Sequence, residues 1–146
     1  MSYTLDANVL LYASDESSPL QAQARKLLVK LAAGPEIAYL FWPVLMSYLR
    51  IATHPTIFGN PLNTDEAMSN VGALVGLPHV RCPGEEAGIW EIYNSIAANQ
   101  SIRGNLVPDA HLFALMRQHG VETIWSQDRD FRRFDGIKVR TLTDLG

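Results

Sequence analysis

Four aspartates lie where predicted β-strands end, although they are far apart in the sequence. Asp6 follows a short apolar segment near the N-terminus, and Asp109 opens a predicted helix. Asp128 and Asp130 follow the strand expected at 122–125. Ligands of an open α/β sheet bind in the crevice beyond the carboxyl ends of the strands. Carboxylates gathered there repel one another unless they are protonated or share a cation. The pattern therefore predicts a divalent-metal site assembled from both ends of the chain.

The chemistry that such a site supports is hydrolysis at a phosphate. Mg²⁺ and Mn²⁺ are hard cations that prefer carboxylate and water oxygens, and Mg²⁺ needs only one or two direct carboxylates. An ion of this kind can activate a water and neutralise a phosphate during in-line displacement. Four aspartates are enough for one or two such ions.

Each aspartate also has a purely structural interpretation. Asp6 could cap the helix that begins at Ala7, because Asp is a preferred N-cap residue. Asp109 follows a proline in a first helical turn, where the helix dipole favours an acid. Asp128 and Asp130 could form a turn. All four nevertheless map to the same edge of the expected sheet, and this joint placement favours the metal site.

Short strands alternate with helices along the chain, and these elements must position the acids. Such alternation predicts parallel βαβ units and an α/β fold. The strands are expected near 3–5, 36–41, 79–82, 122–125 and 138–140, and the helices near 7–12, 20–33, 44–53, 64–76, 85–98 and 109–119.

The composition is that of one ordinary globular domain spanning residues 1–146. The formal charge of -3 gives no overall attraction for nucleic acid. The single cysteine, Cys82, excludes an internal disulfide framework. The N-terminus lacks a secretory pattern, and no apolar run is long enough to span a bilayer. We therefore expect a cytoplasmic protein without a membrane partner.

Four segments resemble parts of the PIN-domain family. Residues 5–13, LDANVLLYA, are similar to the opening strand and helix of a PIN domain. Residues 108–115, PDAHLFAL, resemble its third acidic motif, and residues 125–131, WSQDRDF, resemble its fourth. Residues 41–55 are similar to the corresponding region of VapC-type toxins. The resemblance covers nearly the whole chain, and the order and spacing of the motifs make it specific.

The resemblance implies a three-layer α/β/α fold with a short-stranded, mostly parallel central sheet. It also implies a magnesium- or manganese-dependent endoribonuclease, the toxin of a toxin–antitoxin pair. RNA would be the substrate, and a VapB-like antitoxin and a second copy of the chain would be partners. The motifs also imply roles for individual residues. Asp6, Asp109 and Asp128 would hold the metal, and Asp130 would be a catalytic residue that supports them or serves as an alternative ligand. Asn8 and Ser126 would orient carboxylates or water.

The chain departs from the family pattern in one place. PIN domains commonly carry an acid, often Glu, early in the helix after the second strand. Here residues 43–47 contain no acid, and the alignment places Leu45 in that position. Loss of this ligand weakens the case for a second metal ion, and one ion held by three aspartates and waters remains chemically adequate. The alternative function is a catalytically weakened PIN domain that binds RNA or an antitoxin.

Arginines near the acidic motifs are the candidates for RNA contact. Each could instead pair with a nearby acid or lie in solvent. They are Arg50, Arg103, Arg129 and Arg132. Trp42, Trp90 and Trp125 lie in apolar contexts, so we expect them in the core rather than stacked on bases.

A phospho-receiver or an aspartyl-phosphate phosphatase would also place aspartates at strand ends. The phosphatase pattern needs a second Asp two residues after the first, where this chain has Asn8. The receiver needs a lysine at the end of a late strand, whereas Lys138 begins one. Both classes therefore fit less well than the nuclease.

Overall fold

The computed structural model describes residues 1–145, so Gly146, the last residue of the predicted domain, lies outside the described residues. Strands and helices alternate along the chain as predicted. The strands are β1 (Ser2–Leu5), β2 (Ile37–Tyr39), β3 (Val80–Arg81), β4 (Thr123–Trp125) and β5 (Lys138–Arg140). The α-helices are α1 (Ala7–Ser14), α2 (Gln21–Ala33), α3 (Trp42–Ala52), α4 (Thr64–Val75), α5 (Ile89–Ala97) and α6 (Leu106–Gln118). Two 3₁₀-helices follow β4 and β5: η1 (Arg129–Arg133) and η2 (Leu142–Leu145).

The five strands form one sheet in the order β3-β2-β1-β4-β5, and every pairing is parallel. β1 is central, with Thr4 in register with Tyr39 of β2 on one side and Ile124 of β4 on the other. The carboxyl ends of β1 and β4 therefore lie side by side. This sheet confirms the predicted α/β class and brings the residues after both strands to one edge.

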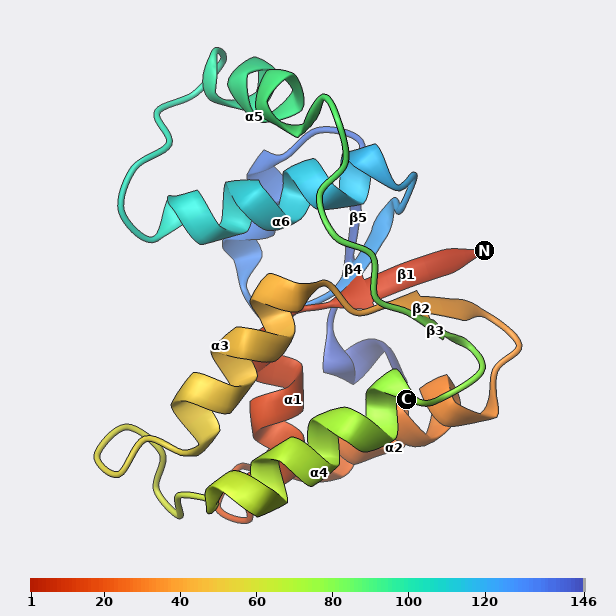
Figure 1. Ribbon diagram of the computed structural model, residues 1–146, viewed down its shortest axis with the longest axis vertical. Helices are drawn as coiled ribbons and strands as arrows, with labels where there is room; N and C mark the ends of the chain where they lie inside the picture. The colour runs from red at the N-terminus through yellow and green to blue at the C-terminus, as the bar shows by residue number, and fades with distance from the viewer. Residues whose placement is uncertain (146) are drawn as a thin grey trace.

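Helices cover both faces of the sheet (Figure 1). α6, with α5 packed on it, lies on one side, whereas α1, α2 and α4 lie on the other. α3 packs on α1 and also reaches α6 at the carboxyl ends of the strands. The predicted three-layer α/β/α arrangement is therefore confirmed. No helix within residues 1–145 is both long and apolar enough to cross a membrane.

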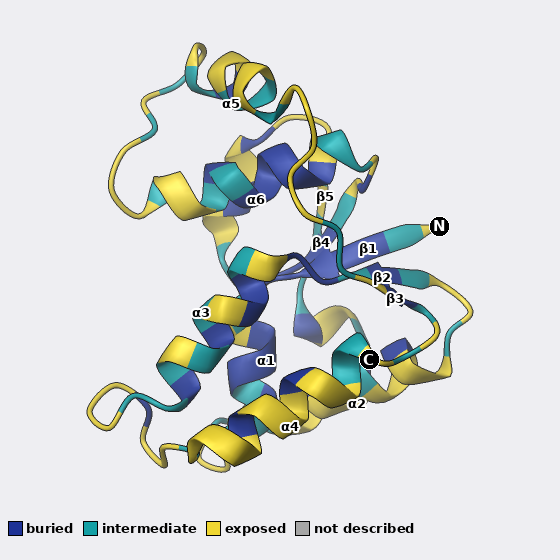
Figure 2. Ribbon diagram, viewed as in Figure 1, coloured by how far each residue is buried: buried dark blue, intermediate teal, exposed yellow. Residues whose placement is uncertain are grey.

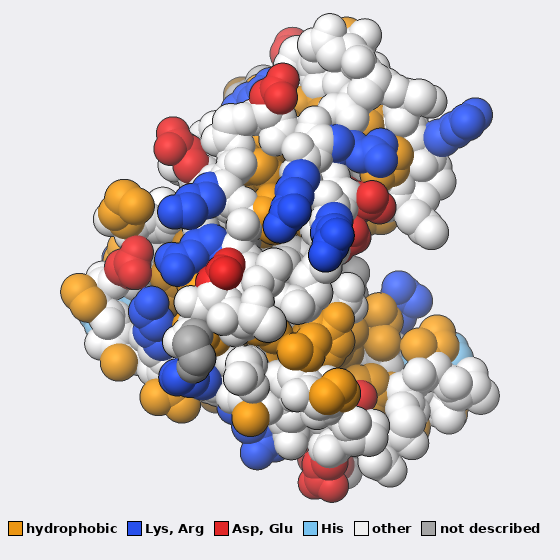
Figure 3. Space-filling model, turned by 180° about the vertical axis from the view of Figure 1, so that it is seen from behind, with side chains coloured by type: hydrophobic (Ala, Val, Ile, Leu, Met, Phe, Trp, Pro, Cys, Tyr) orange, Lys and Arg blue, Asp and Glu red, His pale blue; other side chains and the backbone are white. Residues whose placement is uncertain are grey.

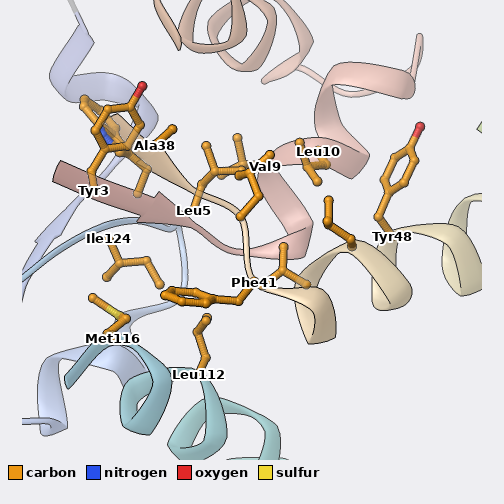
Figure 4. Packing of buried hydrophobic residues seen from close by; sticks show 14 of the residues in the cluster. Tyr3, Leu5, Val9, Leu10, Ala38, Phe41, Tyr48, Leu112, Met116 and Ile124 are labelled. Carbon is orange, nitrogen blue, oxygen red and sulfur yellow. The ribbon is translucent and has the colours of Figure 1, made fainter. Parts of the chain in front are cut away.

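The core lies between the sheet and the two helical layers (Figure 4). Leu5, Phe41 and Ile124 come from the strands or from the segments that follow them, and each is fully buried. Met116 of α6 packs on one side of this layer and Val9 of α1 on the other. The outer faces of α4 and α5 are exposed (Figure 2). Burying the apolar faces of α1 and α6 against β1 and β4 fixes the helix ends that carry Asp6 and Asp109.

Several predicted element boundaries were wrong by a few residues. α3 begins at Trp42 and α6 at Leu106, each with a proline in its first turn, where a missing N–H costs nothing. α5 begins only at Ile89, after an irregular segment that was expected to be helical. The 3₁₀-helix η1 was not predicted.

Two of the three tryptophans lie outside the core, contrary to the prediction. Trp125 is 3% exposed, whereas Trp42 is 41% and Trp90 66% exposed. The Trp42 indole donates to the carbonyl of Cys82 over 3.0 Å. Trp90 stacks on Tyr93, with 6.1 Å between the ring centroids, on the outer face of α5. Local partners therefore hold these two rings at the surface.

Candidate metal centre

Three of the four aspartates predicted to act together line one cavity at the carboxyl edge of the sheet. The cavity has a volume of about 170 Å³ and lies between α1, α3 and α6. Asp6, Asp109 and Asp128 contribute carboxylates to it, and Asn8 contributes an amide. The rest of the lining is largely apolar: Val44, Ile51, Leu112 and Phe131. Seen from behind, acidic side chains lie at the inner edge of an indentation on the right of the molecule (Figure 3).

Asp6 is the innermost acid, and both of its carboxylate oxygens are engaged. It is the N-cap of α1, and its Oδ1 accepts from the backbone N–H of Val9 over 3.2 Å. Its Oδ2 accepts a short hydrogen bond from the Ser126 hydroxyl. Burial raises the pKa of Asp6 to about 6, although these hydrogen bonds oppose the shift. The capping role and the site role therefore belong to the same side chain.

Asp109 lies in the first turn of α6 and faces the other acids. Partial burial, followed by the charges of Asp128, Asp6 and Asp130 in that order, raises the pKa of its carboxyl to about 6. Arg133 opposes this shift. Asp109 therefore experiences the uncompensated negative charge of the cavity.

The tightest group of acids consists of Asp109, Asp128 and Asp130. One carboxylate oxygen from each lies within 4.8 Å of the other two. Asp128 caps η1 by accepting from the Asp130 N–H over 2.8 Å, and this turn brings the Asp130 side chain back towards the cavity. Hard oxygen donors at this spacing fit Mg²⁺ or Mn²⁺. Asp130, expected to support the ligands or to act as an alternative ligand, lies within this group.

The acid missing from α3 was assigned to the wrong position. Leu45 is fully buried in the core and does not line the cavity. α3 instead presents Pro43, Val44, Ser47 and Ile51 to the cavity. Residues two positions apart on an α-helix differ by about 200° in direction, so Leu45 and Ser47 face nearly opposite ways. Ser47 is the polar side chain at the site, and no acid faces the cavity from α3.

The four predicted RNA-contact arginines separate into two groups. Arg129 and Arg132 line a second cavity of about 370 Å³, which shares Asp128 with the first. Arg50 on α3 and Arg103 in the loop before α6 are exposed and line neither cavity. The sequence analysis did not single out Arg133, whose guanidinium lies 3.8 Å from the Asp130 carboxylate.

A PIN domain is the class that this fold and acidic centre define. The sequence profile of the PIN domain matches residues 3–137, so the chain belongs to this family. Its relatives within the family are VapC proteins. Ribonuclease VapC48 of Mycobacterium tuberculosis is 50% identical over 140 residues, which cover 96% of this chain and 97% of that protein. Ribonuclease VapC43 of the same organism is 33% identical over 142 residues, covering 96% and 95%.

Solved structures show the same fold at lower sequence identity. Mycobacterium tuberculosis VapC20, described as a Sarcin-Ricin loop cleaving toxin, has a TM-score of 0.69 at 19% identity, covering 94% of this chain and 98% of that chain. VapBC2 from Rickettsia felis, bound to a DNA fragment from its promoter, has a TM-score of 0.69 at 15% identity, covering 97% and 98%. These likenesses agree with the parallel sheet and its helical layers.

Proposed function

We propose that this protein is a metal-dependent endoribonuclease and the toxin of a toxin–antitoxin pair. The observation that carries the proposal is the convergence of Asp109, Asp128 and Asp130 within 4.8 Å, two of which share a cavity with Asp6. Relatives named ribonucleases, at up to 50% identity over most of the chain, support RNA as the substrate. The solved VapBC assemblies support a VapB-like antitoxin as partner.

Asp109 and Asp128 are the central ligands in this proposal. Asp6 completes the set from the inside and Asp130 from the solvent side. A Mg²⁺ or Mn²⁺ ion held there would lower the pKa of a water and neutralise charge on the scissile phosphate. Ser126 fixes the Asp6 carboxylate and also accepts from the Asp128 N–H over 2.9 Å, so one hydroxyl aligns acids from two strands.

The remaining residues of the cavity would bind and orient the substrate. The Asn8 amide lines the cavity beside Asp6 and can donate to a phosphate oxygen. Arg129 and Arg132 lie next to Asp128 and can bind the neighbouring phosphates. Arg50 and Arg103 are proposed as weaker, outer contacts. We also propose a single PIN domain, a homodimer and a cytoplasmic location, as the family resemblance implies.

RNA cleavage with and without Mn²⁺, followed by sequencing of the cut ends, tests the proposed activity. We expect cleavage only with the metal, and a loss of more than about 100-fold for Asp109→Asn, since even residues that only support metal ligands cost 10–100-fold. Asp65→Asn is the matched control, because Asp65 occupies the first turn of α4, as Asp109 does in α6. Full activity of Asp109→Asn would contradict the proposal.

A binding module without catalytic activity is the second candidate. The observation that favours it is the absence of an acid among the α3 positions that line the cavity. This candidate predicts no cleavage of any RNA pool, together with retained binding of RNA or of an antitoxin. Appearance of cleavage in Ser47→Glu alone would identify the missing carboxylate as the reason.

A further inference from the structure

Basic side chains gather around the edge strand β5, on the face shown in Figure 3. There, Lys and Arg side chains lie across the middle of the molecule. The chain as a whole carries a formal charge of -3, so its composition does not explain this clustering. The β5-edge band consists of five cations from three elements: Lys30 of α2, Arg129 and Arg132 of η1, and Lys138 and Arg140 of β5.

One end of the β5-edge band adjoins the acidic centre. Arg129 and Arg132 line the cavity of about 370 Å³ that shares Asp128 with the acidic cavity. Thr141 and Thr143 also line it, and their hydroxyls lie 2.7 Å apart. Guanidinium groups bind phosphate through paired hydrogen bonds, and hydroxyls can bind phosphate or ribose. This cavity therefore suits the nucleotide that adjoins the one whose phosphate would lie at the acidic centre.

The other end of the band lies around Trp125. Lys30, Lys138 and Arg140 line a small hollow of about 60 Å³ together with this ring and one acid, Glu36. The Arg140 guanidinium lies 4.5 Å and the Lys30 ammonium 6.0 Å from the ring centroid. Val139 lines the cavity of about 370 Å³ that contains Thr141 and Thr143, whereas its neighbours Lys138 and Arg140 line the hollow at Trp125. β5 therefore forms the wall between the two, as side-chain alternation along a strand requires.

None of the five cations is neutralised by a direct ion pair. Within residues 1–145 the salt bridges join His111 to Glu85 and Arg133 to Asp130. Lysines on an edge strand commonly prevent pairing with another sheet. That explanation covers Lys138 and Arg140 of β5, but not Lys30 on α2 or the two arginines on η1. A ligand that spans the three elements would account for the whole band.

We infer that the β5-edge band binds the sugar-phosphate backbone of RNA where the strand leaves the acidic centre. The RNA passes Arg129 and Arg132 first and then crosses the edge of β5 towards Lys30. This inference rests on the proposed function, because the band guides RNA only if the centre accepts it. Affinity should therefore grow with RNA length, and the cations far from the acids should matter only for longer RNA.

Fluorescence anisotropy of the full chain with labelled oligouridine, in EDTA, tests the band without cleavage. A four-nucleotide RNA reaches only the centre, whereas a sixteen-nucleotide RNA reaches the whole band. We expect Lys30→Gln/Lys138→Gln to weaken binding of the longer RNA at least fivefold and to leave the shorter unchanged. Each lost phosphate contact reduces the steepness of log affinity against log salt by about 0.7, so the double variant should reduce it by about 1.4.

The matched control is Arg25→Gln/Arg81→Gln. It also removes one cation from α2 and one from an edge strand, but β3 is the opposite edge of the sheet. We expect it to bind both RNAs as the wild type does. Thermal unfolding checks that each variant is folded, and Lys138→Gln alone serves if the double variant is not.

The outcomes separate this inference from the proposed function. If the double variant binds the longer RNA with wild-type affinity, the β5-edge band does not bind RNA as inferred. The same conclusion follows if the double variant binds both RNAs equally more weakly. If the wild type binds RNA but does not cleave it in Mn²⁺, the proposed nuclease activity is wrong, whereas the proposed RNA-binding role of the β5-edge band still stands. Failure of the wild type to bind or cleave any RNA would overturn both.

Discussion

The acidic cavity has an inner and an outer part, which differ in how far their carboxylate oxygens are already engaged. Asp6, the inner acid, is 7% exposed, and hydrogen bonds from Val9 and Ser126 occupy both of its oxygens. The outer acids, Asp109, Asp128 and Asp130, are more exposed, and a backbone N–H reaches only Asp128. The inner acid is therefore fixed by the fold, whereas the outer acids retain free lone pairs and mutual repulsion. A cation would relieve that repulsion, and the inner acid would set its position.

Removing an outer acid should have the largest effect on metal binding. Asp128→Asn deletes a charge shared by both cavities, so we expect Mn²⁺ affinity measured by calorimetry to fall more than about 100-fold. The free energy of unfolding without metal should not decrease, because repulsion with Asp109 is relieved. Asp135→Asn, an exposed acid just beyond η1, is the control. If Asp128→Asn binds Mn²⁺ as tightly as the wild type, the outer acids are not the main metal ligands.

Adding an acid to the outer part should have the opposite effect. Ser47 lines the cavity from α3 and is partly exposed, so Ser47→Glu can add a carboxylate without entering the core. We expect Mn²⁺ affinity to rise about tenfold, at some cost in metal-free stability from added repulsion. Leu45→Glu, two residues earlier, buries a charge at a fully buried position and should fail to fold. Tighter metal binding in a folded Leu45→Glu protein would contradict the placement of these side chains.

The contrast between Leu45 and Ser47 shows what the sequence could predict. The strand–helix alternation was sufficient for the parallel sheet, and the sheet places the residues after β1 and β4 together. The position of Asp6 and Asp128 at strand ends therefore followed from topology alone. The direction of a helical side chain needs the phase of the helix as well. Leu45, Tyr48 and Ala52 are buried at helical spacing on one side of α3, whereas Val44, Ser47 and Ile51 line the cavity from another side.

The features that could not be predicted depend on short-range geometry or on surface packing. Asp130 joins the outer acids only because η1 turns the chain back after Asp128, and a five-residue 3₁₀-helix has no clear periodic signal. Trp90 resembles a core residue by composition, yet α5 packs on α6 through its other face. In both cases the outcome depends on a contact that residue type and spacing do not specify.

Weakening the inner part should cost stability before it costs metal affinity. Ser126→Ala removes the hydroxyl that donates to Asp6 and accepts from the Asp128 N–H. We expect the free energy of unfolding in urea to fall by about 1–2 kcal/mol, because buried polar groups lose their partner. Cleavage should fall about tenfold, as for residues that orient metal ligands. Exposed Ser69 on α4 provides the control, Ser69→Ala. A larger loss of Mn²⁺ affinity than in Asp128→Asn would reverse the assignment of the inner and outer parts.

The pH dependence of stability should report the uncompensated charge of the outer part. The folded protein raises the pKa of Asp109 from the usual 3.8 to about 6, so the native state binds a proton more tightly than the unfolded chain. The metal-free protein therefore loses stability as pH rises from about 4 to 6, and it bears the full cost above that range. Asn resembles the protonated form, so Asp109→Asn should match the wild type near pH 3, below the unfolded pKa, and exceed it by about 1 kcal/mol at pH 7.5, after allowance for solvent screening.

Urea unfolding in EDTA at the two pH values measures this difference, with Asp65→Asn as the control that should show none. Saturating Mn²⁺ at pH 7.5 should then raise the stability of the wild type and not that of Asp109→Asn, because only a folded site with the carboxylate binds the ion. A difference between wild type and Asp109→Asn that does not change with pH would mean that Asp109 carries no strain from its neighbours. The outer part would then lack the repulsion that distinguishes it from Asp6, whose charge the fold already supports with two hydrogen bonds.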